Sequence, residues 1–198
     1  MTNLSELRKT AAYYLIQPAV RLLARTPITP NTLTWFGFLL TIGAAVLITQ
    51  GYLLAAGVVV LIAGFFDILD GALARSTNRV TQFGAVLDAT LDRLAEVVLL
   101  LSILVLYASA RVVTHTVVTS LALLGSLLVS YIRAKAEAVG LECQVGLFTR
   151  SERVVVLALG LLLSQFANAL LIALAIIVVF SFITITQRLL YVWRQTKN

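Results

Sequence analysis

The stretch LLAAGVVVLIAGFFDILDGAL, Leu53–Leu73, decides the fold class. It is long enough to cross a bilayer, for which a helix needs about 20 apolar residues. Its only charged side chains, Asp67 and Asp70, come near its end. Backbone groups in lipid find hydrogen-bond partners only in a helix or a closed barrel, and the polar–apolar alternation of barrel strands does not occur here. The stretch therefore predicts a transmembrane helix.

Comparable apolar stretches occur along the rest of the chain. Of its 198 residues, 60% are hydrophobic and only 12% are charged, whereas soluble domains carry roughly 25% charged residues. This composition excludes a soluble globular domain and a disordered chain. We expect an all-α integral membrane protein with six transmembrane helices, over Leu33–Thr49, Leu53–Leu73, Phe83–Tyr107, Val112–Ile132, Val154–Gln165 and Ala167–Leu190.

The segment before the first stretch has a different pattern. Residues 1–25 place apolar side chains at three- and four-residue spacing with cations between them, which is typical of an amphipathic helix lying in the membrane interface. Residues 26–198 then form the six-helix domain. No apolar segment with a cleavage site follows the N-terminus, so we expect no cleavable signal peptide.

The charges predict an orientation. The net charge is +6, and most cations flank alternate ends of the apolar stretches, which places both termini and the charged loops on the cytosolic side of the cell membrane. The positive charge is therefore attributed to the membrane and not to nucleic acid. The single cysteine, Cys143, excludes an intramolecular disulfide.

Four aspartates stand where the second and third stretches meet the cytosol. Asp67 and Asp70 share one helix face, and Asp88 and Asp92 share another. Each costs on the order of 2.5–3.5 kcal/mol within a span, and the four carboxylates repel one another. Two divalent cations would offset both effects, and oxygen ligands favour Mg²⁺ or Mn²⁺ over zinc. A divalent-cation transporter is the alternative from another class.

Small residues accompany the acids. Gly71, Ala74 and Gly84 would leave a notch between helices that admits a ligand to the backbone, although such residues also serve helix packing. Arg75 is a candidate to hold a phosphate; the alternative is a cation that marks the cytosolic side and pairs with Glu96 or another acid. Glu96 lies one further turn beyond Asp92, and it would either extend the metal face or pair with a nearby arginine.

The pattern Asp67–x–x–Asp70–Gly71–x–x–Ala74–Arg75, followed after eight residues by Gly84–x–x–x–Asp88–x–x–x–Asp92, resembles the signature of the CDP-alcohol phosphotransferase family. The resemblance covers nearly the whole chain. It implies transfer of a phosphatidyl group from CDP-diacylglycerol, or a related CDP-lipid, to an alcohol with release of CMP. It also implies a homodimer.

The resemblance also implies roles for individual residues. Asp92 would be the general base as well as a metal ligand. The two divalent cations, Mg²⁺ or Mn²⁺, would be bound by Asp67, Asp70, Asp88 and Asp92. The CDP-lipid would be bound by Pro30, Asn31, Thr32, Leu33, Gly71, Ala74, Arg75, Thr81 and Gly84.

Cations at three predicted helix ends favour a phosphorylated acceptor. They resemble the pattern of phosphatidylinositol phosphate synthases, whose acceptor is inositol 1-phosphate, and this implies that the acceptor phosphate contacts Arg133, Lys135, Arg153 and Arg188. Residues 133 and 135 lie about 200° apart on a regular helix, so both reach one pocket only if the helix loosens there. Glycerol 3-phosphate, the acceptor in phosphatidylglycerophosphate synthesis, is the alternative.

Overall fold

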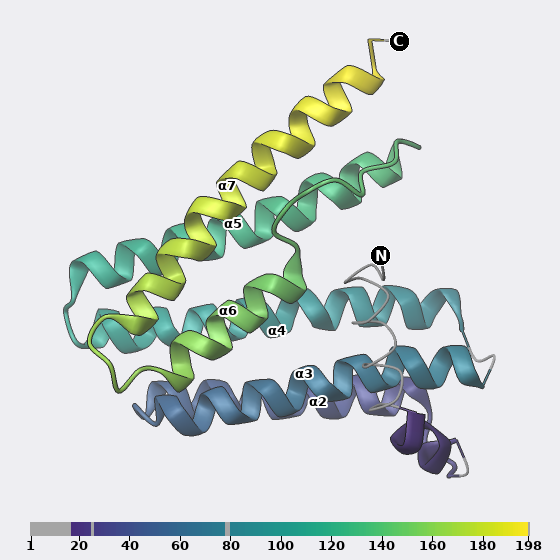
Figure 1. Cartoon of the computed structure of the whole chain (residues 1–198), viewed down its shortest axis with the longest axis horizontal. Coiled ribbons are helices and arrows are strands. Elements are labelled where there is room, and N and C mark those ends of the chain that lie inside the picture. Colours follow the sequence, from purple (N-terminus) through teal and green to yellow (C-terminus); the bar gives the residue numbers. More distant parts are fainter. Residues whose placement is uncertain (1–16, 25, 78–79, 198) are drawn as a thin grey trace, which may run out of the picture.

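The computed structural model describes residues 17–24, 26–77 and 80–197, and every regular element in these ranges is helical. Figure 1 shows long helices lying side by side, with the last parts of α5 and α7 projecting beyond the others. Besides a short helical segment at residues 17–23, the elements are α2 (Pro30–Thr49), α3 (Leu53–Ser76), α4 (Gln82–Ser109), α5 (Val113–Ala138), α6 (Arg150–Leu162) and α7 (Ala169–Gln195).

The helices pack in a closed ring. The main packing partners follow the order α2, α3, α6, α7, α5, α4 and back to α2. The helices α3 and α4, which carry the four aspartates, are therefore both held by α2 but are not a main packing pair themselves. This arrangement leaves room between α3 and α4 for side chains to face one another.

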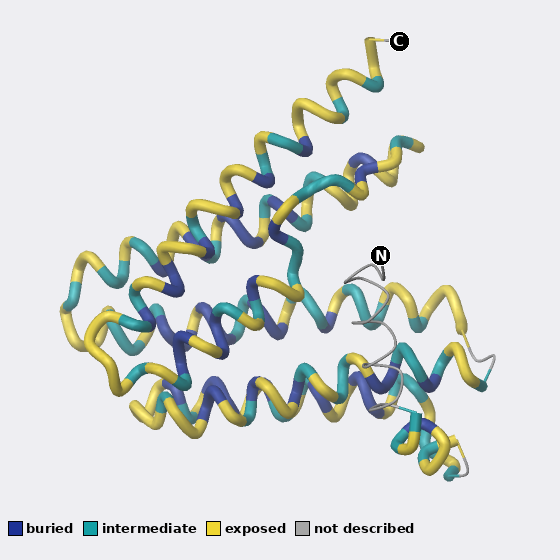
Figure 2. Tube along the Cα trace, in the orientation of Figure 1, coloured by how far each residue is buried: buried dark blue, intermediate teal, exposed yellow. Residues whose placement is uncertain are grey.

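The apolar core lies mainly at the end of the ring remote from the aspartates. It includes Ile48, Val60, Ile103, Leu161 and Leu174, each at most 2% exposed. Buried stretches in Figure 2 run along the inward faces of the helices, and exposed residues cover the outer faces. Many of the outward residues are large and apolar, as expected for a surface in contact with lipid.

Small residues allow the helices to approach one another closely at the end of the ring that holds the apolar core. A Cβ added to Gly160 would lie 2.5 Å from the Cβ of Ala173, and one added to Gly57 would lie 2.9 Å from Leu162 Cγ. These contacts bring α6 against α7 and against α3, as small residues do in membrane helix packing.

Among the described residues, four helices are long and apolar enough to cross a membrane: α2, α3, α5 and α7. The expected six apolar helices are present as α2–α7, but α4 and α6 differ from the other four. The α4 helix carries four charged residues, Asp88, Asp92, Arg93 and Glu96. The α6 helix has only 13 residues, which extend about 20 Å at 1.5 Å per residue. The described part of the chain is all-helical and fits a multi-pass membrane protein, and four of the six expected helices meet both criteria for a span.

The helices that begin near the aspartates, α2, α4 and α6, have polar N-terminal caps. Thr29 accepts a hydrogen bond from the backbone of Thr32 at the start of α2, and Thr81 does the same for Gly84 at the start of α4. Thr149 and Glu152 form a capping box at the start of α6, which satisfies backbone N–H groups reciprocally.

Much of the expected interfacial helix, residues 1–16, lies outside the described residues. Residues 17–23 are helical, and Val20 packs with Leu33, Leu69 and Leu73 in a small buried cluster. The cluster attaches this segment to α2 and α3 beside the aspartates.

Candidate active site

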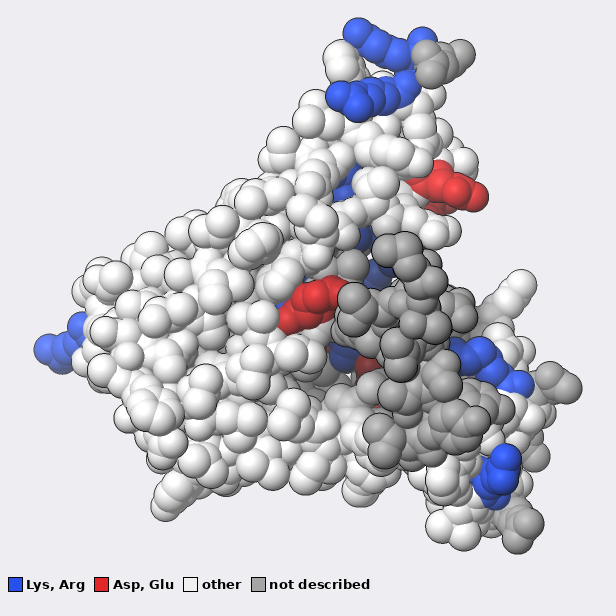
Figure 3. All heavy atoms as spheres, viewed as in Figure 1, with Lys and Arg blue, Asp and Glu red and all other residues white. Residues whose placement is uncertain are grey.

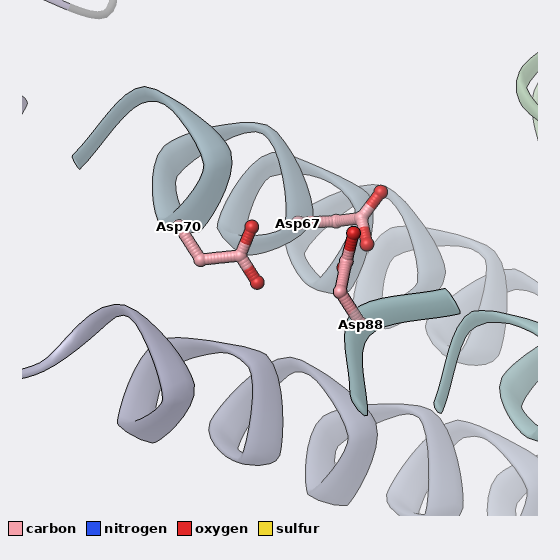
Figure 4. A group of neighbouring side chains, drawn as sticks. All are labelled: Asp67, Asp70 and Asp88. Atoms are coloured by element: carbon pink, nitrogen blue, oxygen red, sulfur yellow. The ribbon is translucent and has the colours of Figure 1, made fainter. Parts of the chain in front are cut away.

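Three carboxylates meet between α3 and α4. Asp67 and Asp70 come from α3 and Asp88 comes from α4, and Figure 4 shows their carboxylates turned toward one another. One oxygen of each lies within 4.8 Å of the others. Asp70 is 4% exposed, and its buried Oδ2 has no hydrogen-bond partner in the described part of the chain. A hard divalent cation fits this set, because it binds carboxylate oxygens and would satisfy the orphaned atom.

The short connection from α3 to α4 and the packing of α2 against both helices bring these aspartates together. The α3 helix ends at Ser76 and α4 begins at Gln82, so the last turns of α3 and the first turns of α4 lie at the same end of the molecule. The three-residue spacing in α3 turns both aspartates to one face. Because α2 packs against both helices, it holds the two faces opposite each other.

The fourth aspartate has a different partner. Asp92 forms an ion pair with Nη1 of Arg150, the first residue of α6. The same nitrogen lies 3.1 Å from Oδ2 of Asp67. Asp92 therefore stands beside the group of three, joined to it through Arg150. Arg150 was not among the residues that the sequence singled out, because its charge alone resembles that of any cation at a cytosolic helix end.

A cavity of about 360 Å³ opens on one side of the carboxylates. We call it the glycine cavity. It is lined by Pro30, Asn31, Thr34, Asp70, Gly71, Ala74, Arg75, Val80, Thr81, Gly84, Ala85 and Asp88. Seven of the nine residues expected to bind the CDP-lipid line it. Thr32 is exposed and Leu33 is buried in the small cluster with Val20, so neither lines it, whereas Thr34, which the sequence analysis missed, does.

Gly84 makes the closest approach in the glycine cavity. A Cβ at this position would lie 2.9 Å from Thr81 Oγ1 and 3.2 Å from Asn31 Oδ1. A side chain here would therefore displace a helix cap and a lining residue. On the opposite wall, the guanidinium of Arg75 lies back over Gly71, where an added Cβ would be 3.4 Å from Nη1.

A second cavity, of about 300 Å³, opens on the other side. We call it the basic cavity because five arginines line it. The lining comprises Asp88, Ala89, Asp92, Arg93, Val129, Ser130, Arg133, Glu137, Thr149, Arg150, Arg153 and Arg188. Three of the four residues expected to bind the acceptor phosphate are present. Lys135 is exposed and is not part of the lining, because α5 remains a regular helix to Ala138.

The arginines of the basic cavity differ in their surroundings. Arg133 is exposed and pairs with Glu137 on its own helix. Arg153 is 1% exposed, and its Nε and Nη2 donate to the two carboxylate oxygens of Glu96. Arg188 is 2% exposed and donates to the carbonyls of Val145 and Val129. Of the two alternatives for Glu96, the structure supports the pairing with an arginine.

The two cavities share a wall. Asp88 lines both of them, and Asp70 and Asp92 each line one. Each cavity also contains arginine. The arrangement suits two anionic molecules that react with each other across a row of carboxylates.

The chain is similar to known proteins over most of its length. Residues 27–186 match the sequence profile of the CDP-alcohol phosphatidyltransferases. The chain is 36% identical over 175 residues to the archaetidylinositol phosphate synthase of Methanothermobacter thermautotrophicus, covering 87% of each protein. It is 36% identical over 200 residues to the phosphatidylinositol phosphate synthase of Mycobacterium tuberculosis, covering 98% of this chain and 92% of that one.

Solved structures of the M. tuberculosis synthase are similar in fold. The structure with CDP-diacylglycerol bound has a TM-score of 0.83 at 35% identity and covers 91% of this chain and 94% of that one. The structure in complex with manganese and citrate has a TM-score of 0.81 at 36% identity and covers 89% and 88% of the two chains.

Proposed function

Because this chain belongs to the CDP-alcohol phosphatidyltransferase family, we propose that it transfers a phosphatidyl group, or the related archaetidyl group, from a CDP-lipid to inositol 1-phosphate and releases CMP. The relatives described above are named as synthases of archaetidylinositol phosphate and of phosphatidylinositol phosphate. They favour neither a glycerol 3-phosphate acceptor nor a cation transporter.

The observation that carries this proposal is the shared wall at Asp88. A nucleotide with its pyrophosphate needs a polar cavity with a cation, and the glycine cavity offers Arg75, Asn31 and Thr81. A phosphorylated acceptor needs several donors, and the basic cavity offers guanidinium groups, which match phosphate geometry. The reacting phosphorus would lie between the two cavities, beside the carboxylates.

We propose that Asp67, Asp70, Asp88 and Asp92 hold the divalent cations. The oxygen-only ligand set fits Mg²⁺ or Mn²⁺, and a similar protein has been solved with manganese. When bound, such ions supply charge stabilisation to the pyrophosphate and to the departing CMP.

In this proposal the chain's own residues orient the reactants and accept a proton. The acceptor's hydroxyl oxygen forms a new bond to the phosphorus that carries the lipid, and the bond from that phosphorus to CMP breaks. The hydroxyl proton passes to the Asp92 carboxylate, which lines the basic cavity and acts as general base. Arg133, Arg153 and Arg188 hold the acceptor phosphate, and Arg75 holds the donor phosphates.

We also propose how the protein lies in the membrane. Lys and Arg gather mainly at one end of the molecule in Figure 3, with a small group at the opposite end, and the positive-inside rule places the richer end in the cytosol. The six helices α2–α7 would then lie in the cell membrane with both termini and the site on the cytosolic side. Residues 1–25 would lie in the interface, and the protein would form a homodimer.

The experiment offers the purified protein CDP-diacylglycerol with Mg²⁺ or Mn²⁺ and one acceptor at a time. The acceptors are inositol 1-phosphate, glycerol 3-phosphate, inositol and serine, and CMP release is measured. We expect release with inositol 1-phosphate. Release with glycerol 3-phosphate alone would overturn the proposed acceptor while leaving the family chemistry intact.

A further inference from the structure

One arginine nitrogen joins carboxylates from two helices. Nη1 of Arg150 lies 3.1 Å from Oδ2 of Asp67 on α3 and pairs with Oδ2 of Asp92 on α4. Arg150 itself belongs to a third helix, α6. A monovalent side-chain cation therefore lies among the aspartates that the proposed function assigns to divalent cations.

The guanidinium of Arg150 does not form the usual two-pronged pair with either carboxylate. Arginine usually meets a carboxylate through two parallel N–H groups, whereas here both ion pairs use Nη1. Nε of Arg150 is buried and has no hydrogen-bond partner in the described ranges. The ion pairs therefore place a positive charge beside the two carboxylates, and they leave Nε of Arg150 without a partner in the described ranges.

Arg150 also lines the basic cavity. The capping box holds the backbone at the start of α6, with the Thr149 N–H donating to Glu152 Oε2 at 2.9 Å. The side chain is 27% exposed. A change of its rotamer, without movement of the helix, could therefore turn the guanidinium away from the aspartates and toward the cavity.

We infer that Arg150 is a resident counter-cation that a second divalent cation displaces, and that the displaced guanidinium then binds the phosphate of the acceptor. The inference rests on the proposed function, because it assigns metal to the aspartates and a phosphorylated acceptor to the basic cavity. While the second ion is absent, Arg150 supplies one positive charge between the carboxylates of Asp67 and Asp92. Once displaced, it adds donors to the basic cavity.

This exchange couples the two ligands. If the second cation frees Arg150 for the acceptor, then the acceptor phosphate must favour binding of the second cation by the same factor, because binding linkage is reciprocal. Without Arg150 the second cation meets no competitor, and the acceptor no longer influences it.

The test measures Mn²⁺ binding to the purified protein by electron paramagnetic resonance, with and without inositol 1-phosphate. In the wild type we expect the second ion to bind more weakly than the first, and inositol 1-phosphate to tighten it by about tenfold. In Arg150→Ala we expect the second ion to bind about tenfold more tightly, with no effect of inositol 1-phosphate. Arg150→Met keeps the apolar stem and serves the same purpose if Arg150→Ala does not fold.

Arg93→Ala is the matched control. Arg93 lines the same cavity but donates to the carbonyl of Ala89 on its own helix, so removing its charge should change the second affinity by less than about twofold. Equal second-ion affinities in the wild type and the Arg150 variants would overturn the inference and leave the proposed function standing. A wild type that binds no Mn²⁺ would instead overturn the metal assignment itself.

Discussion

Arg153 and Glu96 form a buried ion pair that joins α6 to α4. The guanidinium Nε and Nη2 donate to the two carboxylate oxygens at 2.5 Å and 2.8 Å, and Nη1 donates to the carbonyl of Phe148 at 3.3 Å. These contacts use three of the five N–H groups of an arginine. Glu96 therefore fixes the plane of Arg153 while leaving donors for the basic cavity.

Loss of this pair should destabilise the protein. Glu96→Ala leaves a guanidinium that is 1% exposed without its counter-charge, and breaking a buried pair in this way costs about 3–5 kcal/mol. Thermal unfolding in detergent measures the effect. The control is Glu137→Ala, which breaks the exposed pair with Arg133 and should cost less than about 1 kcal/mol. Equal losses would contradict the role given to Glu96.

Substitution of Gly84 should weaken CDP-lipid binding. In Gly84→Ala the new Cβ would lie 2.9 Å from Thr81 Oγ1 and 3.2 Å from Asn31 Oδ1, so the wall of the glycine cavity must shift. We expect KM for the CDP-lipid to rise by about tenfold, equivalent to about 1.4 kcal/mol, with little change in KM for the acceptor.

The control for this substitution is Gly43→Ala. Gly43 lies in α2, and a Cβ there meets nothing within 4 Å. Because alanine also has the higher helix propensity, this variant should retain normal kinetics. If the two variants behave alike, the close contact at Gly84 does not shape the site.

The two cations at the end of α5 should differ in their effects. Arg133 lines the basic cavity, whereas Lys135 does not. Arg133→Ala should therefore raise KM for the acceptor by about tenfold, as expected when a charged hydrogen bond is lost, and Lys135→Ala should raise it less than twofold, roughly the effect of a surface charge. Initial rates at varied inositol 1-phosphate measure both. A larger effect from Lys135 would mean that this part of α5 unwinds when the acceptor binds.

Asp92 should be needed for turnover and not for the fold. Asp92→Asn removes the proton acceptor, and general base catalysis contributes about 10²–10⁴-fold to rates. We expect CMP release to fall by that factor while the variant still binds the CDP-lipid, as followed by fluorescence of a labelled donor. Turnover near the wild-type rate would refute the assignment of Asp92 as the base.

The sequence predicted the site best where charged side chains stand inside an apolar helix, because burying them there costs free energy. Carboxylates inside an apolar helix need compensation, and this predicted that the four aspartates converge. The structure brings oxygens of Asp67, Asp70 and Asp88 within 4.8 Å of one another, whereas Asp92 stands beside them and pairs with Arg150. The six apolar helices were also evident. The ends of these helices were harder to predict, because a helix continues through polar residues as long as its backbone is paired. The α5 helix, for example, runs on to Ala138.

The partners of the arginines could not be predicted in the same way. Arg150 and Arg153 begin α6, and Arg188 comes close to the end of the last predicted apolar stretch, Leu190. The positive-inside rule already accounts for cations at such positions. Their partners lie far along the chain: Glu96 is 57 residues from Arg153, and Asp67 is 83 residues from Arg150. Which arginine meets which acid depends on the ring order of the helices, in which α6 packs against α3 at Gly57 and against α7 at Gly160. No local pattern in the sequence specifies that order.

The most direct test of the metal site is anomalous diffraction at the manganese edge from crystals of this protein grown with Mn²⁺. We predict an anomalous peak within coordination distance of Asp67, Asp70 and Asp88, and its loss in crystals of Asp70→Asn. Crystals that hold Mn²⁺ elsewhere, or that show no peak between these carboxylates at saturating Mn²⁺, would contradict the account.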